Sequence, residues 1–215
     1  MSSSDAPKIG VLGGSFNPVH LGHLSIAQQV VSNLKLDKAI LIPAGLPPHK
    51  DSAKMASAED RLEMCRIAVR GLHGLEVSDL EVRKQTTSYT IETIQALQKE
   101  LPEGAKTWFI IGADTVPELP TWHRIQELVS LTNWAIVRRP KVRKPDFKEI
   151  ADALSEESAR RLEAGLVQIE EPVDISSTEI RQRLEAGDHV RGLLRKDVEE
   201  YIRKKGLYGA PAQPK

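Results

Sequence analysis

Short apolar runs that stop at glycine or proline alternate along this chain with segments of helical spacing. Residues 8–12 are followed by two glycines, residues 38–42 by a proline and residues 107–111 by a glycine. Continuous apolar runs of this length are typical of parallel strands that are buried on both faces. Because strands that alternate with helices form sheets covered by helices on both sides, the sequence predicts a doubly wound parallel α/β sheet.

The other elements follow the same pattern from one end of the chain to the other. We expect further strands over 75–78, 134–137 and 166–169, and helices over 24–34, 57–72, 90–100, 123–128, 146–164, 178–186 and 196–205. Residues 8–208 are expected to form one domain, a usual size for a single core. The ends, 1–7 and 209–215, are rich in Ser, Pro and Ala and are expected to be loose.

Composition excludes several classes of protein. Over 215 residues the chain carries 30 Lys+Arg against 30 Asp+Glu, which argues against a broad nucleic-acid-binding surface, and its 40% apolar content argues against disorder. One cysteine excludes an intrachain disulfide and favours the cytoplasm. No signal peptide is expected, and the uncharged stretch 9–34 is too rich in Gly and His to span a membrane. Assembly into a homo-oligomer is compatible with these features.

The uncharged stretch contains the first candidate site, GGSFNPVHLGH over residues 13–23. Its glycines let a ligand approach the backbone closely, and His20 and His23 share a face at the start of a helix. Imidazoles in this position suit a polyphosphate and can stabilise charge that grows in a transition state. Two other interpretations stay open. The histidines could be surface or capping residues, or a zinc pair that has no third ligand nearby.

The second candidate site is ISSTEIR over residues 175–181, which follows the last expected strand and opens a helix. Hydroxyls and free N–H groups at a helix N-terminus bind anions, and Arg181 lies one turn into the helix, where it can fork onto a phosphate. Taken alone, this segment is better explained as an ordinary Ser/Thr cap with a surface arginine.

Taken together, the two segments resemble the paired signatures of the nucleotidylyltransferase superfamily, and further blocks resemble bacterial nicotinate mononucleotide adenylyltransferases. These blocks are Ile42-Pro43 with Pro47-Pro48-His49-Lys50, Ser88-Tyr89-Thr90 with Glu92-Thr93, Gly112-Ala113-Asp114 with Leu119, Pro120 and Trp122, Arg138-Arg139-Pro140, and Tyr201-Ile202 with Leu207-Tyr208. The resemblance covers about residues 8–208 and implies a Rossmann-like sheet of the nucleotidylyltransferase type, with C-terminal helices. Asn17 stands where the commoner family pattern has Asp, and we expect a turn role for it.

The resemblance implies transfer of AMP from ATP to nicotinate mononucleotide, giving nicotinate adenine dinucleotide (deamido-NAD) and pyrophosphate in NAD biosynthesis. It implies ATP contacts at Gly13, Gly14, Ser15, Phe16, His20, His23, Gly112, Asp114, Ser177, Thr178 and Arg181, with His20, His23 and Arg181 as the catalytic residues. It implies mononucleotide contacts at Ser15, Phe16, Lys50, Ser88, Tyr89, Thr90 and Trp122. Mg²⁺ is expected to be carried by ATP, with no ligand from a protein side chain.

Other interpretations of these features remain. Another adenylyltransferase of the superfamily, with a nicotinamide mononucleotide or phosphopantetheine acceptor, a cytidylyltransferase, or a non-catalytic nucleotide sensor would share the two main motifs. Without the blocks, Trp122 is explained by packing or surface exposure, Tyr89 by packing, Asp114 by helix capping and Lys50 by solvation.

Overall fold

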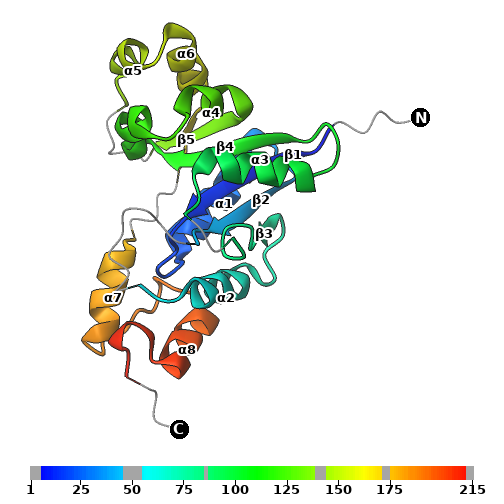
Figure 1. Cartoon of the computed structure of the whole chain (residues 1–215). Coiled ribbons are helices and arrows are strands. Elements are labelled where there is room, and N and C mark those ends of the chain that lie inside the picture. The colour runs from blue at the N-terminus through cyan, green and yellow to red at the C-terminus, as the bar shows by residue number, and fades with distance from the viewer. Residues whose placement is uncertain (1–5, 46–54, 85–86, 139–143, 171–174, 212–215) are drawn as a thin grey trace.

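The computed structural model describes residues 6–45, 55–84, 87–138, 144–170 and 175–211. Within these residues six strands form one parallel sheet in the order β3-β2-β1-β4-β5-β6 (Figure 1). The strands are β1 Lys8–Gly14, β2 Lys38–Pro43, β3 Leu75–Val77, β4 Lys106–Gly112, β5 Asn133–Arg138 and β6 Leu166–Gln168. The predicted doubly wound parallel sheet is therefore confirmed.

The strand order determines where a ligand can bind. β1 lies in the middle of the sheet, with β2 and then β3 added on one side of it. The chain then crosses to the other side of β1, where β4, β5 and β6 follow in order. The loops that follow β1 and β4 therefore leave the sheet in opposite directions and open a crevice at its carboxyl edge. Gly14, at the end of β1, and Gly112, at the end of β4, lie at this edge.

Helices cover both faces of the sheet. The described helices are α1 Leu21–Leu34, α2 Ala58–Val69, α3 Thr90–Glu100, α4 Ile125–Leu131, α5 Phe147–Ala153, α6 Glu156–Ala164, α7 Ser177–Glu185 and α8 Lys196–Lys205, with the 3₁₀ helices η2 Ala113–Thr121 and η3 Leu207–Gly209. Successive strand residues point to opposite faces, so Leu12 and Ile110 pack with α1, α2, α7 and α8, whereas Val11 and Phe109 pack with α3 to α6. Figure 1 shows α2, α7 and α8 grouped at the opposite end of the molecule from α5 and α6.

Several boundaries differ from the predictions. The helix predicted over 146–164 is two helices, because the Ser155 side chain accepts a hydrogen bond from the Ser158 N–H and caps a new helix. The 3₁₀ helix η2, which contains Pro117 and Pro120, was not predicted, and the helix expected over 123–128 begins at Ile125. Ala210, in the end expected to be loose, is 5% exposed and packs in the core.

No helix in the described part of the chain is both long enough and apolar enough to cross a membrane.

Candidate functional site

The loop after β1 is held in place by hydrogen bonds to distant parts of the chain. The Asn17 side-chain oxygen accepts hydrogen bonds from the Ala56 N–H at 3.1 Å and from the Tyr208 hydroxyl at 2.7 Å. Burial raises the pKa of the Tyr208 phenol, so this hydroxyl stays protonated and can donate. Asn17 is 6% exposed and lies in the turn, as expected, and its peptide bond to Pro18 is cis.

The two histidines of the loop are stacked on one another. Helix α1 begins earlier than predicted, at Leu21, which makes His20 the N-cap residue. The His20 N–H donates to Nδ1 of His23 at 3.3 Å, and the two rings stack with centroids 3.6 Å apart. Because Nδ1 of a neutral His23 accepts this hydrogen bond, Nε2 carries its proton and can donate to a ligand. His20 therefore occupies the cap position of α1, and the bond from its backbone N–H orients the His23 ring, which takes part in the cap.

The N-terminus of α7 packs directly on this loop, although the two segments are more than 150 residues apart in the chain. The Ser177 hydroxyl donates to the Pro18 carbonyl at 3.0 Å, and Arg181 Nη1 donates to the Asn17 carbonyl at 2.8 Å. Arg181 Nη2 also donates to the Thr178 hydroxyl at 3.2 Å. The structure thus brings the two candidate segments together in one site, with a guanidinium and a helix N-terminus beside the histidines.

Ser176 occupies the cap position of α7. Its side chain accepts a hydrogen bond from the Thr178 N–H at 3.2 Å, and the helix starts at Ser177, one residue earlier than predicted. The ordinary capping role that the sequence allowed therefore belongs to Ser176. The Thr178 hydroxyl belongs to an exposed residue of the first turn, where it can face a ligand.

Two cavities next to this loop share the residues that were predicted for the second substrate. A cavity of about 230 Å³ reaches from the end of β1 into the protein, and its lining includes Gly13, Gly14, Glu81, Ser88, Thr90, Phe109 and Trp122. A cavity of about 600 Å³ is lined by Ser88, Tyr89, Thr90, Glu118, Thr121, Trp122 and His123. Ser88, Thr90 and Trp122 line both cavities, so these three predicted acceptor residues lie together, and the smaller cavity also reaches Gly13 and Gly14 of the nucleotide loop.

Aromatic rings shape these cavities. The Trp122 ring packs edge to face against Phe109, with ring centroids 6.1 Å apart. Trp122 is partly exposed. The Tyr89 side chain is 41% exposed and its ring lies against His123 at 4.3 Å. Trp122 packs on the core cluster that contains Phe109 and also lines both cavities, so packing explains part of its position. Tyr89 is exposed and lines the larger cavity, so packing alone does not explain its position.

The remaining predicted site residues include Gly112 and Asp114, at and just after the end of β4, Phe16 in the loop after β1, and Lys50. Gly112 ends β4, and a Cβ there would collide with Oδ1 of Asp114, which stands exposed in the first turn of η2. Phe16 has a φ of 44° and is 1% exposed, with its ring against Gly14 and edge to face with His23. The Phe16 ring therefore supports the loop from inside, and its contact with either substrate stays a prediction. Lys50 lies outside the described residues.

Arg61 is a buried residue of this region that the sequence did not reveal as functional. It is 1% exposed, and its guanidinium donates to the carbonyl oxygens of Ser15 and Gly45. Arg61 lies on the same face of α2 as Met64, Cys65 and Ala68, which are buried. A charged residue in an apolar helical stripe was the available signal in the sequence.

Metal-ligating side chains do not cluster in the described part of the chain: no group of three His, Cys, Asp or Glu could hold an ion there. The donors around the loop are N–H groups, hydroxyls, imidazoles and a guanidinium. These groups suit phosphate oxygens rather than a divalent cation.

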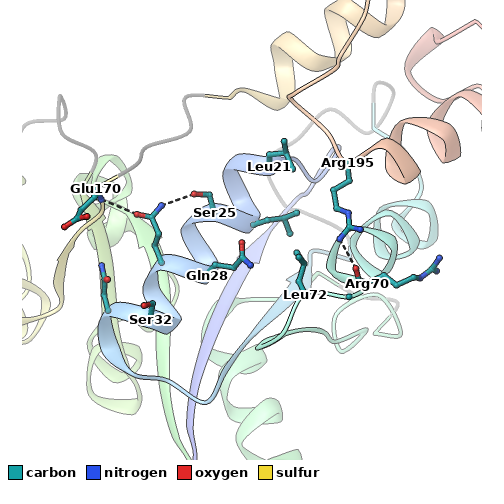
Figure 2. Close-up of a pocket in the computed structure, with 12 residues that line it drawn as sticks. Leu21, Ser25, Gln28, Ser32, Arg70, Leu72, Glu170 and Arg195 are labelled. Carbon is teal, nitrogen blue, oxygen red and sulfur yellow. Dashed lines mark hydrogen bonds between the residues drawn. The ribbon is translucent and has the colours of Figure 1, made fainter.

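A larger hollow, of about 860 Å³, runs along the exposed side of α1 (Figure 2). Figure 2 shows Glu170 on one side of the helix and Arg70 and Arg195 on the other. None of the described site residues lines this hollow.

Comparisons with known proteins show the family of this chain. A cytidylyltransferase-like family model matches residues 11–183. A protein of Dehalococcoides mccartyi named "Probable nicotinate-nucleotide adenylyltransferase" is 38% identical, over 94% of this chain and 97% of its own length. One of the same name from Enterococcus faecalis is 40% identical, over 94% of this chain and 84% of its own length.

A solved structure is similar in fold. The Plasmodium falciparum nicotinic acid mononucleotide adenylyltransferase complexed with NaAD has a TM-score of 0.76 and 19% sequence identity, and the match covers 95% of this chain and 98% of that one. Given the family model and the extent of the matches to curated relatives, this chain belongs to the cytidylyltransferase-like family and, within it, to the nicotinate-nucleotide adenylyltransferases.

Proposed function

We propose that this protein transfers AMP from ATP to the phosphate of nicotinate mononucleotide, forming nicotinate adenine dinucleotide and releasing pyrophosphate. One observation carries the proposal: Ser177 and Arg181, at the start of α7, donate hydrogen bonds to the Asn17–Pro18 turn of the loop that leads to His20 and His23. The cavity lined by Trp122 opens at the same loop, at Gly13 and Gly14. A site for a triphosphate and a site for an aromatic acceptor are therefore adjacent.

This reaction depends on neutralising the negative charge of both substrates more than on a general base. The nucleophile is a phosphate monoester, whose second pKa of about 6 leaves it largely ionised at pH 7. The enzyme must bring two anions together and hold the attacking oxygen in line with the α-phosphorus. Donors that are already fixed in place stabilise the charge of the transition state without having to reorganise.

The loop and α7 supply such donors for ATP. The Ser177 hydroxyl and Nη1 of Arg181 hold the carbonyls of the Asn17–Pro18 turn. We assign Nε2 of His23, the Thr178 hydroxyl and the remaining N–H groups of the Arg181 guanidinium to ATP as donors. We assign Arg181 and the α7 N-terminus to the pyrophosphate that leaves, and His23 to the phosphates on the α1 side. Mg²⁺ carried by ATP would supply further neutralisation of the phosphate charge, beside the donors of the loop and α7.

The mononucleotide is assigned to the two joined cavities. Trp122 offers an aromatic face for the pyridine ring, and Ser88 and Thr90 line both cavities together with it. With the ring in this place, the acceptor phosphate points back to the loop at Gly13 and Gly14. The reacting atoms then meet beside His23.

Replacing Trp122 with alanine is expected to raise the KM for nicotinate mononucleotide by about 10- to 100-fold, the effect of losing one stacked ring. The KM for ATP should stay near its wild-type value, because Trp122 lies on the acceptor side. Trp122→Phe keeps a ring and should recover most of the loss. Initial rates measured with each substrate varied in turn provide the test. Equal increases in both KM values would contradict ring stacking on Trp122.

Product analysis tests the proposed reaction. The protein is incubated with Mg²⁺, nicotinate mononucleotide and ATP labelled at the α-phosphate. The products are then separated and identified by mass spectrometry. The label should appear in nicotinate adenine dinucleotide, with one pyrophosphate released per molecule formed. Label recovered as free AMP, or ATP left unchanged, would contradict AMP transfer.

A further inference from the structure

The Arg61 side chain, contributed by helix α2, joins three separate segments at the carboxyl edge of the sheet. Its Nη1 donates to the Ser15 carbonyl at 2.8 Å, its Nη2 to the Gly45 carbonyl at 2.9 Å and its Nε to the Ala56 carbonyl at 3.1 Å. Ser15 belongs to the loop after β1, Gly45 to the loop after β2 and Ala56 to the chain that enters α2. One planar group thus fixes the distances between these three segments.

Two other hydrogen bonds connect the same segments and help Arg61 to hold them together. The Ala44 N–H donates to the Gly14 carbonyl at 2.8 Å, and the Ala56 N–H donates to the Asn17 side chain at 3.1 Å. Both bonds connect the loop after β1 to the segments that Arg61 holds. Arg61 holds Ser15, which lies between Gly14 and Asn17 in the chain, so we expect its removal to loosen the loop at Ser15.

The positive charge of Arg61 is shielded from solvent and has no directly bonded carboxylate among its described partners. The nearby Glu81 carboxylate interacts with it through space, accepts a hydrogen bond from the Gly45 N–H and accepts another from the Thr93 hydroxyl at 2.6 Å. Gly45 is therefore held from both sides, its carbonyl by Arg61 and its N–H by Glu81. A Cβ at Gly45 would collide with the Glu81 carbonyl oxygen, so only glycine fits.

We propose that Arg61 is a positioning residue for AMP transfer: it holds the loop at Ser15 in the geometry that receives the ATP phosphates and places a buried positive charge behind that loop. The inference rests on the proposed function and deepens it. Arginine suits this role because its fork can donate to three carbonyls at once while it keeps its charge. Lysine would keep a charge but could not span the three acceptors.

The test uses the full-length Arg61→Lys variant, with Arg195→Lys as the matched control. Arg195 also donates to two backbone carbonyls, those of Ala68 and Arg70, but it lies on the hollow beside α1, away from the site. We measure Tm, the Kd for ATP by calorimetry, and kcat and both KM values per folded molecule. Arg61→Lys should lower kcat/KM for ATP by about 10- to 100-fold, the size of effect that a displacement near 1 Å produces.

The control should lower Tm by a similar amount and leave the Kd for ATP and kcat per folded molecule unchanged. A weakened Kd for ATP in Arg61→Lys alone would support the positioning role. If Arg61→Lys behaves like the control, with activity that follows only the folded fraction, the proposal is overturned. Failure of the proposed function would look different, because wild-type protein would then form no nicotinate adenine dinucleotide.

A second variant keeps the test decisive if Arg61→Lys folds poorly. Removing Arg61 alone takes one of two positive neighbours from Glu81, the other being Lys84, and leaves the carbonyls of Ser15, Gly45 and Ala56 without their donor. The double variant Arg61→Met with Glu81→Gln removes both charges, and the amide that replaces the carboxylate keeps one oxygen as an acceptor for the Thr93 hydroxyl. It should fold and still show the weakened Kd for ATP. Wild-type binding in this folded double variant would overturn the proposal.

Discussion

Replacing His23 with asparagine should lower kcat by about 100- to 1000-fold, the loss seen when one donor to a transition state is removed. The asparagine oxygen can replace Nδ1 as the acceptor for the His20 N–H, which is bonded at 3.3 Å in the wild-type protein. No atom of asparagine replaces the Nε2 donor. Tm should fall by only about 2–4 °C, which corresponds to about 1 kcal/mol in a chain of this size.

His73→Asn is the matched control, since His73 is exposed and does not line the site cavities. Its kcat should equal that of the wild-type enzyme. Near-normal turnover in a well-folded His23→Asn variant would exclude His23 from transition-state stabilisation. His20→Ala is the weaker experiment, because His20 is 7% exposed and caps α1, so that a change there affects folding as well as turnover.

The second large effect is expected at Arg181. Arg181→Gln should lower kcat/KM for ATP by about 100- to 1000-fold, the loss caused by removing one fixed donor to a transition state. The variant loses the positive charge beside the loop and the bond from Nη1 to the Asn17 carbonyl. Arg181→Lys keeps the charge but not the fork and should recover only part of the loss.

Arg183→Gln is the control on the same helix. Arg183 forms an exposed i,i+4 pair with Glu179, which stabilises a helix by only a few tenths of a kcal/mol. Initial rates at varied ATP should therefore match the wild type for Arg183→Gln. Equal losses in Arg181→Gln and Arg183→Gln would show that the effect comes from α7 stability and not from contact with ATP.

The strands were predictable because buried parallel strands appear as continuous apolar runs. The strand expected over 107–111 is β4, Lys106–Gly112, and the helix expected over 90–100 is α3, Thr90–Glu100. The break inside 146–164 was not predictable from periodicity, since the helical pattern continues through Ser155. That break depends on one serine side chain that bonds the N–H three residues further on.

The pairing of the loop after β1 with the start of α7 was predictable, because both segments follow strands and resemble a known pair of signatures. The role of Arg61 was not. Its three acceptors are backbone carbonyls, which are present at every residue, and they converge only after the sheet has formed. The same holds for Tyr208, whose hydroxyl reaches Asn17 from the far end of the chain.

The most direct measurement compares acceptors. Pyrophosphate release from ATP is followed with nicotinate mononucleotide, nicotinamide mononucleotide or phosphopantetheine offered separately, and kcat/KM is determined for each. This account predicts the highest kcat/KM for nicotinate mononucleotide and none above background for phosphopantetheine, which has no ring to stack on Trp122. A kcat/KM for phosphopantetheine, or for nicotinamide mononucleotide, that exceeds the value for nicotinate mononucleotide would contradict it.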